Sequence, residues 1–275
     1  MRRRLLPYGW YPQSQTLVAE HITAWNKELQ TVQQTACAAI APHAGWFFSG
    51  KLAWLSWLSA YEADCVVIAG GHLGARQPLV VYADDSYEVP SGELPVSQEL
   101  MKAVMSKYTT RPETSADNTV EIQLPLCAER FGKTVPVLGL RVPEDEQAES
   151  LGIMLAKWCT TNKKKLFVLG STDLTHYGPN YGFIPAGIGA NAQAWAKRND
   201  RSFIDACLAM DSKAILHTGR DQQAACSSGA VLCAVSFAKA MLATHAQLQA
   251  YDTSLSKHPD DSFVGYCSIT FSQPC

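Results

Sequence analysis

Three histidines follow hydrophobic runs that have the composition of buried strands. His43 comes just after ACAAIA and a proline, and His72 comes after CVVIAGG. His176 follows KLFVLGS together with Asp173. In sheets that helices cover on both faces, ligands bind beyond the carboxyl ends of the strands. A single histidine at a strand end is more often structural, but if these strands are neighbours their imidazoles converge in one cleft.

Such a cleft has the chemistry of a metal site, because neutral imidazole is a ligand of iron, copper and zinc. Two histidines leave a divalent ion short of ligands and of negative charge, so a third, anionic ligand is expected. The candidates are Asp173, Glu121 and a cysteine. Cys226 stands just before a hydrophobic run, where the N-terminus of a helix would favour a thiolate.

Each of these anionic candidates also has a structural interpretation. Cys226, taken alone, reads as an ordinary buried cysteine. Glu121 lies in the first turn of a predicted helix capped by Thr119, where a carboxylate complements the helix dipole. Asp173 orients a histidine, or else caps the turn that follows it through its own backbone. The residue types alone leave these alternatives open.

Strand-like and helix-like patterns alternate along the whole chain. The expected strands are 36–41, 65–70, 78–83, 135–142, 165–171, 247–254 and 263–271. The expected helices are 17–29, 52–61, 100–105, 151–158, 203–208 and 230–242. Continuous apolar strands between helices predict an α/β fold, a single domain over 1–275 with a central, mostly parallel or mixed sheet and helices on both faces.

Composition excludes several classes of function. The net charge of −2 supplies no basic field for nucleic acid or for anionic lipid. No run reaches the roughly 18 apolar residues of a membrane span, and the start of the chain lacks the apolar region of a signal peptide. The 9 cysteines are odd in number and form no CxxC pair. These features predict reduced thiols and a cytoplasmic protein without nucleic-acid or membrane partners.

Several segments together resemble one known family. APHAGWFFSG resembles the PHAGY-x-YSG segment of the Memo family, also called AmmeMemoRadiSam system protein B, and STDLTHYG resembles its SSDxSH(Y/W)G segment. NTVEIQLP is similar to EHSLEVQLP, and ACSSGAV to the more loosely matching CGxxPI stretch. Further matches in GWYP, VVIAGGHLG and YEVPSGELPVSQEL extend the resemblance over nearly the whole chain.

The resemblance implies a fold like that of the LigB-like class III extradiol dioxygenases, in which two histidines and a carboxylate hold Fe(II). In Memo proteins the corresponding positions look like His, His and Cys. Carried over to this sequence, the implied metal ligands are His43, His72 and Cys226. His176 would be the acid/base or substrate-side group. The implied acids of the pocket, which we group with His176 as catalytic candidates, are Asp173 and Glu121.

The sequence also departs from the family pattern. Asn118 replaces the histidine of EHSLE, Gly70 and Gly71 replace a proline and a serine, and the cysteine segment lacks the family's arginine. Asparagine forms hydrogen bonds but carries no charge near neutral pH. These departures bear on the substrate, whereas the implied ligand trio is intact.

What the resemblance implies for function is a metal-binding protein, either an iron-using, dioxygenase-like oxidoreductase of unknown substrate or a non-catalytic protein that keeps the cleft for a metal or a partner. Fe(II) is the implied metal, with Cu or Zn as alternatives because thiolate is a soft ligand. The family context implies a radical-SAM protein and an AMMECR1-like protein as partners.

Overall fold

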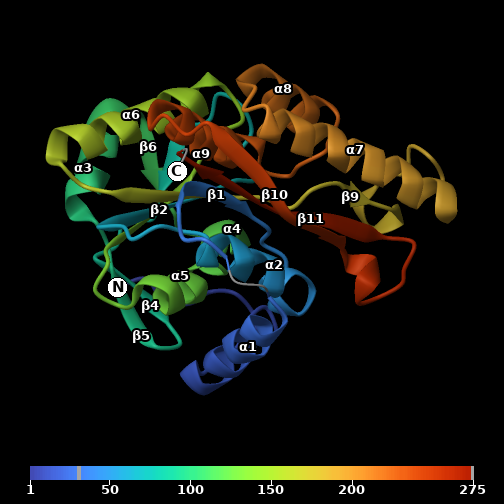
Figure 1. Ribbon diagram of the computed structural model, residues 1–275, viewed down its shortest axis with the longest axis horizontal. Coiled ribbons are helices and arrows are strands. Elements are labelled where there is room, and N and C mark those ends of the chain that lie inside the picture. Colours follow the sequence, from blue (N-terminus) through green and yellow to red (C-terminus); the bar gives the residue numbers. More distant parts are fainter. Residues whose placement is uncertain (30–31, 274–275) are drawn as a thin grey trace.

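The computed structural model describes residues 1–29 and 32–273. Among them, one sheet runs in the order β10-β11-β1-β8-β2-β7-β3-β6, and the short strand β9 pairs with β11 (Figure 1). Its strands are β1 (Ala36–Ala41), β2 (Cys65–Gly70), β3 (Leu79–Val81), β6 (Thr110–Pro112), β7 (Val137–Arg141), β8 (Leu166–Ser171), β9 (His176–Tyr177), β10 (His245–Thr253) and β11 (Phe263–Ser272). A separate hairpin joins β4 (Ser86–Val89) to β5 (Gly92–Pro95).

The centre of the sheet is parallel and its flanks are mixed. Strands β1, β8, β2 and β7 run parallel to one another, whereas β11 is antiparallel to both β1 and β10, and β3 is antiparallel to β7. This arrangement confirms the predicted mixed α/β sheet. The antiparallel C-terminal strands extend the sheet beyond β1 and leave β10 at its edge.

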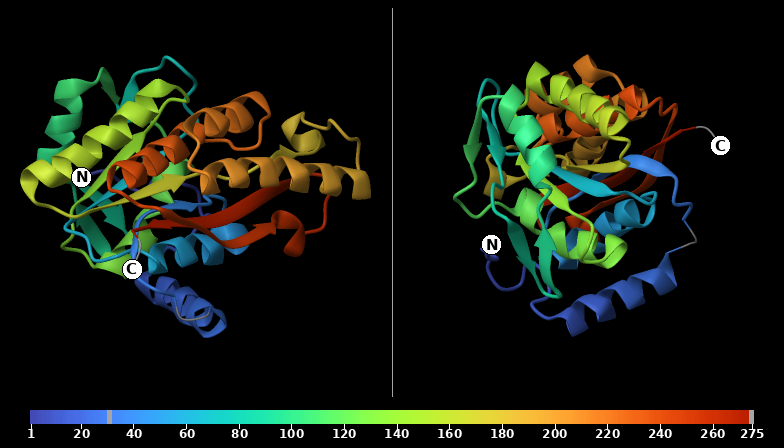
Figure 2. Two further views of the ribbon diagram at one scale, coloured as in Figure 1. Left: turned by 45° about the horizontal axis from the view of Figure 1, so that its top comes forward. Right: turned by 90° about the vertical axis from the view of Figure 1, so that its left-hand side faces the viewer.

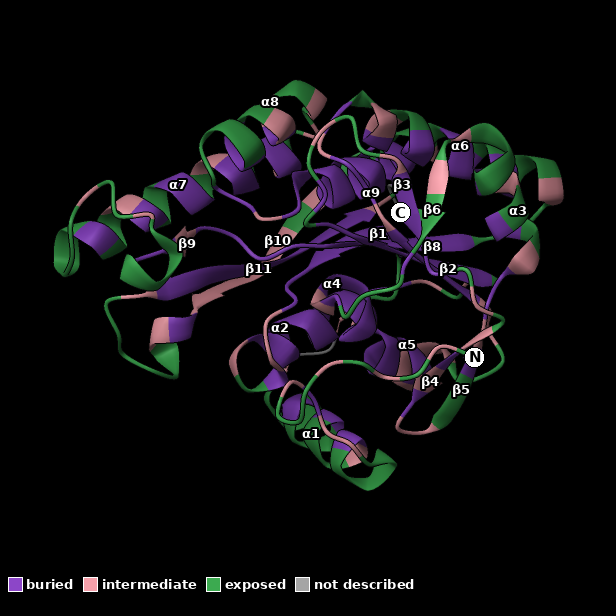
Figure 3. Cartoon of the chain, turned by 180° about the vertical axis from the view of Figure 1, so that it is seen from behind, coloured by how far each residue is buried: buried purple, intermediate pink, exposed green. Residues whose placement is uncertain are grey.

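Helices cover both faces of this sheet (Figures 1 and 2). The helices on one face are α6 (Glu146–Asn162), α7 (Ala190–Leu208), α8 (Ser212–Leu216) and α9 (Ser228–Ala240), with α3 (Gln98–Lys107) at its end. The helices on the other face are α1 (Gln15–Glu28), α2 (Trp46–Leu58), α4 (Asn118–Glu121) and α5 (Leu124–Phe131). The strands are mostly buried and the outer sides of the helices are exposed (Figure 3). Among the described residues, no helix is both long and apolar enough to cross a bilayer.

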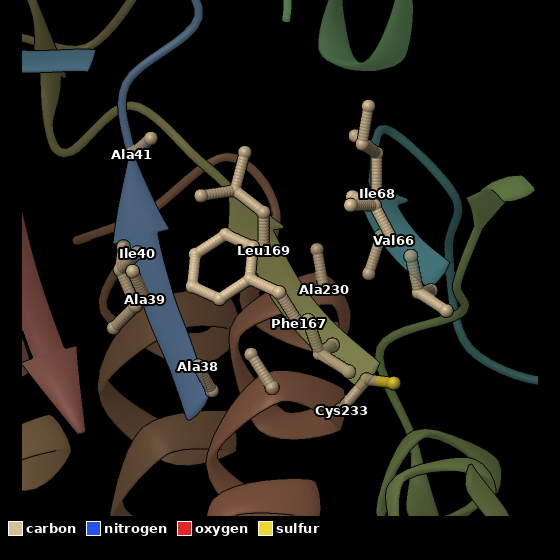
Figure 4. Packing of buried hydrophobic residues seen from close by; sticks show 14 of the residues in the cluster. Ala38, Ala39, Ile40, Ala41, Val66, Ile68, Phe167, Leu169, Ala230 and Cys233 are labelled. Atoms are coloured by element: carbon tan, nitrogen blue, oxygen red, sulfur yellow. The ribbon is translucent and has the colours of Figure 1, made fainter. Parts of the chain in front are cut away.

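The central strands are apolar on both faces because both faces are packed. Ile40, Ile68 and Leu169 come from three adjacent strands and are 0% exposed. Figure 4 shows these strands side by side, with Ala230 and Cys233 of α9 packed against them. Each fully buried side chain of this size contributes about 1.5–3 kcal/mol of hydrophobic stabilisation. This core fixes the relative positions of the three strand ends on which the candidate histidines lie.

The structure differs from the sequence-based expectations in short elements. The β4–β5 hairpin, β6, β9 and α8 are not predicted by the hydrophobic pattern, because runs this short carry too little periodicity. The helix that contains Glu121 has only 4 residues, and its N-cap is Asp117, not Thr119. The Asp117 side chain accepts a hydrogen bond from the Thr119 backbone N–H (3.0 Å), which is the usual capping interaction.

Candidate metal centre

The carboxyl ends of β1, β8 and β2 meet at one edge of the sheet. Ala41 at the end of β1 pairs with Ser171 at the end of β8, and Ala69 of β2 pairs with Gly170. The loops that leave these neighbouring strands carry the predicted histidines. The sheet topology therefore places the three loops together, as the strand-end argument expected.

His43, His72 and Cys226 form a compact group of metal-ligand atoms. One ligand atom from each side chain lies within 4.8 Å of the others. The Nε2 atom of His43 is 3.2 Å from the Cys226 sulfur, and the two imidazole rings are 5.1 Å apart with an almost perpendicular arrangement. The distances suit side chains that surround a common point.

His43 is held in place by polar groups at the end of β8 and in the loop that follows it. Its Nδ1 atom lies 3.2 Å from the Ser171 hydroxyl, and its backbone N–H donates to the Asp173 carboxylate (2.7 Å). The Gln123 side chain donates to the carbonyl of Pro42 (2.8 Å) and so fixes the loop. With Nδ1 engaged, Nε2 is the nitrogen that faces Cys226.

His72 has a different support, because it lies in a loop with a strained backbone. Its φ angle is 54°, in the left-handed region that non-glycine residues rarely adopt. The Arg141 guanidinium donates to the carbonyls of Gly71 and His72, both at 2.8 Å, and holds this turn. The Nδ1 atom of His72 is 3.4 Å from the Asp117 carboxylate, an arrangement that supporting carboxylates adopt at metal sites.

Cys226 has the electrostatic surroundings of a thiolate. Burial raises the pKa of its thiol, but His43, His176 and His72 together lower this pKa well below its usual value. The residue immediately precedes α9 and its N-cap Ser227. Among the described cysteines it alone is not fully buried. A cysteine in this position is therefore suited to act as an anionic ligand.

His176 and Asp173 complete the cluster without belonging to the ligand group. The Nε2 atom of His176 is buried and has no hydrogen-bond partner among the described residues. It lies 3.9 Å from the Asp173 carboxylate, and Asp173 is equally far from His43. The ring of Tyr181 lies 4.9 Å from that of His176. The His176 side chain therefore lies beside the ligand group, and no hydrogen-bond partner among the described residues occupies this nitrogen.

Glu121 does not belong to this site, so its expected role as an acid of the pocket does not match the structure. Its carboxylate accepts hydrogen bonds from the backbone N–H groups of Leu5 (2.9 Å) and Leu6 (2.9 Å) and from the Tyr11 hydroxyl (3.0 Å). Glu121 thus fastens the N-terminal segment to α4. By contrast, Asn118 does reach the site, where its amide donates to the carbonyl of His43 (3.0 Å).

Two cavities approach the cluster from different sides. The larger, of about 680 Å³, is lined by His43, His72, Asp173 and His176 on its inner side. The smaller, of about 280 Å³, is lined by His176 and Cys226. His176 borders both cavities. The large cavity exposes the histidines, and the small cavity exposes the Cys226 sulfur.

A family model described as a Memo-like protein matches residues 7–270. The chain belongs to the Memo family. Among curated relatives, a MEMO1 family protein of Pyrococcus abyssi is 29% identical, with 94% of this chain and 95% of the relative covered. A MEMO1 family protein of Thermococcus onnurineus is 28% identical, with 96% of each chain covered. These matches confirm the resemblance that the sequence motifs indicated.

The Memo-like fold also has a counterpart among solved structures. The crystal structure of an uncharacterized protein from Escherichia coli K12 superposes with a TM-score of 0.52 and 11% sequence identity. The match covers 84% of this chain and 98% of the other. At this level of identity the similarity concerns the fold, and it says nothing about the reaction.

In this Memo-family chain, Asp117 is a functional candidate that the sequence motifs did not single out. Burial raises the pKa of its carboxyl, but His72, Thr119 and Arg141 lower it more, so the group is a carboxylate. A carboxylate behind a histidine ligand makes the imidazole more basic and fixes its orientation. The local signal was available in the sequence, because the family pattern has an acidic residue at this place in EHSLE.

We expect Asp117→Asn to lower the affinity of the site for a divalent metal by about 10-fold to 100-fold, the range that supporting residues of metal sites show. Asparagine keeps the capping hydrogen bond and the shape of the side chain, so the loss of charge behind His72 is the main change. Competition with a chromophoric chelator measures the affinity. Asp85→Asn, at an exposed site, is the control, and equal affinities of the two variants would contradict the assigned role.

Asp200 of α7 holds the segment that carries Asp173 and His176. Its carboxylate accepts hydrogen bonds from the Thr175 backbone N–H (2.9 Å) and from the Tyr251 hydroxyl (2.7 Å). Burial raises the pKa of Asp200 to about 6, and these hydrogen bonds offset only part of that effect. Ionisation of Asp200 therefore destabilises the folded state.

Because this pKa is higher in the folded state than in the unfolded chain, the free energy of unfolding falls as the pH rises from about 4 to about 6. We expect Asp200→Asn, which can keep both hydrogen bonds, to remove this dependence. The stabilisation of the variant relative to the unchanged protein should therefore be larger at pH 7 than at pH 4 by roughly 2 kcal/mol. Urea unfolding at both pH values measures this difference, and an equal effect at both would contradict it.

Proposed function

We propose that this protein binds a transition metal through His43, His72 and Cys226 and acts as an iron-dependent, dioxygenase-like oxidoreductase on a small organic substrate. One observation carries the proposal: the ligand atoms converge within 4.8 Å beside a buried histidine nitrogen that has no hydrogen-bond partner among the described residues. Fe(II) is proposed from the resemblance to the extradiol dioxygenases, and the soft thiolate ligand leaves Cu and Zn as the alternatives. Reduced cysteines throughout the described residues support a reducing, cytoplasmic setting.

The residues fit a metal because each imidazole has its outer nitrogen occupied. Ser171 stands behind Nδ1 of His43, and Asp117 stands behind Nδ1 of His72. Both rings therefore offer Nε2 to the centre, which is the arrangement of supported metal-binding histidines. A bound metal would supply Lewis-acid and redox chemistry at this point.

The remaining residues provide for proton movement and positioning. His176 is placed to take a proton at Nε2 from a substrate hydroxyl and to return it later. Burial lowers the pKa of His176, but Cys226 and Asp173 raise it more, so the pKa lies above its usual value. Asp173 lies between His43 and His176 and keeps the two rings in a fixed relation.

A non-catalytic role as a metal-binding or partner-binding protein is the second candidate. The observation in its favour is the sulfur ligand, because a thiolate beside an oxidant is itself open to oxidation. The radical-SAM and AMMECR1-like partners implied by the family context belong with this candidate as well as with the first. The first candidate needs His176 for turnover. In the second candidate there is no turnover, and the binding of a partner does not depend on His176.

The test is the metal content of protein purified without chelators, followed by oxygen uptake with a panel of catechols. We expect His176→Ala to keep the metal and to lose oxygen uptake, because the residue is a proton carrier and not a ligand. His245→Ala, at an exposed residue in β10, should change neither property. Loss of metal from His176→Ala, or unchanged uptake, would refute the role given to this residue.

A further inference from the structure

We propose that the larger cavity takes a flat aromatic molecule that carries a cationic group at the end remote from the metal ligands, with Asp260 as the residue that selects this charge. The inference deepens the proposed function and rests on it for the identity of the reacting end. It names the class of substrate that the walls of the cavity favour. The walls, the charges and the order of the residues along the cavity each contribute evidence.

The mouth of the cavity is built from exposed aromatic side chains. Tyr8 is 89% exposed, Phe47 is 65% exposed and Tyr181 is 46% exposed, and all three line this cavity. Among the described residues, these are the aromatic members of the exposed large hydrophobic side chains. Exposed rings gathered at one mouth offer stacking and edge-to-face contacts to a flat ligand.

Asp260 supplies the fixed charge at the outer end of the cavity, whereas the histidines His43, His72 and His176 lie at its inner end. Asp173 lies at the inner side and Asp260 at the rim, and no lysine or arginine is among the described lining residues. A substrate with a carboxylate or phosphate at its outer end would therefore meet no fixed cation there. Aromatic faces next to a carboxylate attract organic cations, through both the ring quadrupole and the charge.

Hydrogen bonds and ring contacts place Asp260 on the outer side of Tyr181. Tyr181 contacts the His176 ring, and the backbone N–H of the adjacent Asn180 donates to the Ser262 hydroxyl (3.1 Å). The Ser262 backbone N–H in turn donates to the Asp260 carboxylate (3.2 Å). The cavity therefore runs from the ligand group past His176 and Tyr181 to Asp260.

The two ends of the cavity thus have opposite electrostatic preferences. The inner end has the metal-ligand group and the N-terminus of α2, which begins at Trp46 and favours an electron-rich oxygen. The outer end has Asp260, whose carboxylate lies 4.0 Å from His258 and is 43% exposed. Since His258 competes for this carboxylate, its removal should strengthen the selection of a cation.

The test compares three phenols that differ in the charge of one substituent: tyramine, 4-ethylphenol and 3-(4-hydroxyphenyl)propionate. Isothermal titration calorimetry on the metal-free protein measures their affinities. We expect tyramine to bind about five-fold more tightly than 4-ethylphenol, the factor typical of one cation–π or exposed ion-pair contact, and the anion to bind more weakly than both. His258→Gln should increase the preference for tyramine.

Asp260→Asn should abolish the preference for tyramine and leave the affinity for 4-ethylphenol unchanged. Asp261→Asn, at an exposed neighbour outside the cavity lining, should leave the preference intact. Phe47→Ala should lower the affinity for all three phenols by the same factor. Equal binding of the three phenols, or a preference that survives Asp260→Asn, would overturn the inference. Because the protein is metal-free, this result is independent of the metal-content test of the proposed function.

Discussion

Replacing His43 by alanine is expected to lower the affinity for the metal by more than about 100-fold, beyond the range that supporting residues show. The imidazole is 1% exposed, and its Nε2 atom lies 3.2 Å from the Cys226 sulfur. Its removal leaves one nitrogen and one sulfur as ligands. Elemental analysis after dialysis, together with competition by a chelator, measures the loss.

Cys226→Ser extends the same prediction to the anionic ligand. Serine keeps the size of the side chain but replaces the thiolate by a neutral hydroxyl, so the site loses negative charge and its preference for soft metals. We expect metal occupancy to fall as it does in His43→Ala and His72→Ala. His217→Ala, an exposed histidine of the π-helical turn, is the control. Full occupancy in all three ligand variants would refute the proposed site.

The sequence predicted the strand-end histidines well because their signal is local. Each follows a continuous apolar run, and in a parallel sheet such runs end at a common edge. Cys226 is different, because its contact with His43 joins residues 183 positions apart. Residue chemistry left Cys226 as one of three candidates for the anionic ligand, and the family resemblance selected it, since neither periodicity nor spacing reports which loops meet.

Ser171 and Arg141 are supporting residues of the site that the sequence could not predict. Ser171 is the last residue of an apolar strand, and nothing in its neighbours shows that its hydroxyl faces His43. Arg141 likewise ends β7, and its two bonds to the His72 turn depend on the pairing of β2 with β7. Such contacts arise from the tertiary arrangement of strands and have no counterpart in local composition.

Glu121 shows that a family motif can fix the position of a residue next to a site although its side chain does not line that site. The motif fixes the position of Glu121 on α4, and Asn118 on the same short helix reaches the carbonyl of His43. One turn further along, Glu121 faces the N-terminal segment and binds its backbone N–H groups. Residues three positions apart lie on roughly the same side of a helix, yet these two side chains reach different neighbours, so proximity in sequence did not determine the role.

The contact between α6 and α9 gives the second large expected effect, which concerns stability. Gly152 of α6 lies against the backbone of α9, where a Cβ atom would come within 2.4 Å of the Cys233 carbonyl and 2.7 Å of the Phe237 nitrogen. Backbone atoms of a helix cannot move aside alone, so an alanine would separate the two helices. Since α9 also packs on the central strands, the whole layer would shift.

We expect Gly152→Ala to lower the free energy of unfolding by about 3 kcal/mol and the melting temperature by roughly 5–10 °C, even though alanine is the better helix former. Thermal and urea unfolding measure both quantities. Gly74→Ala is the matched control, because a Cβ atom there meets nothing within 4 Å. If Gly152→Ala were as stable as this control, α6 and α9 would have to be less closely packed than the structure shows. The packing of α9 on the central strands would then be open to adjustment, and so would the position of Cys226, which directly precedes the N-cap of α9.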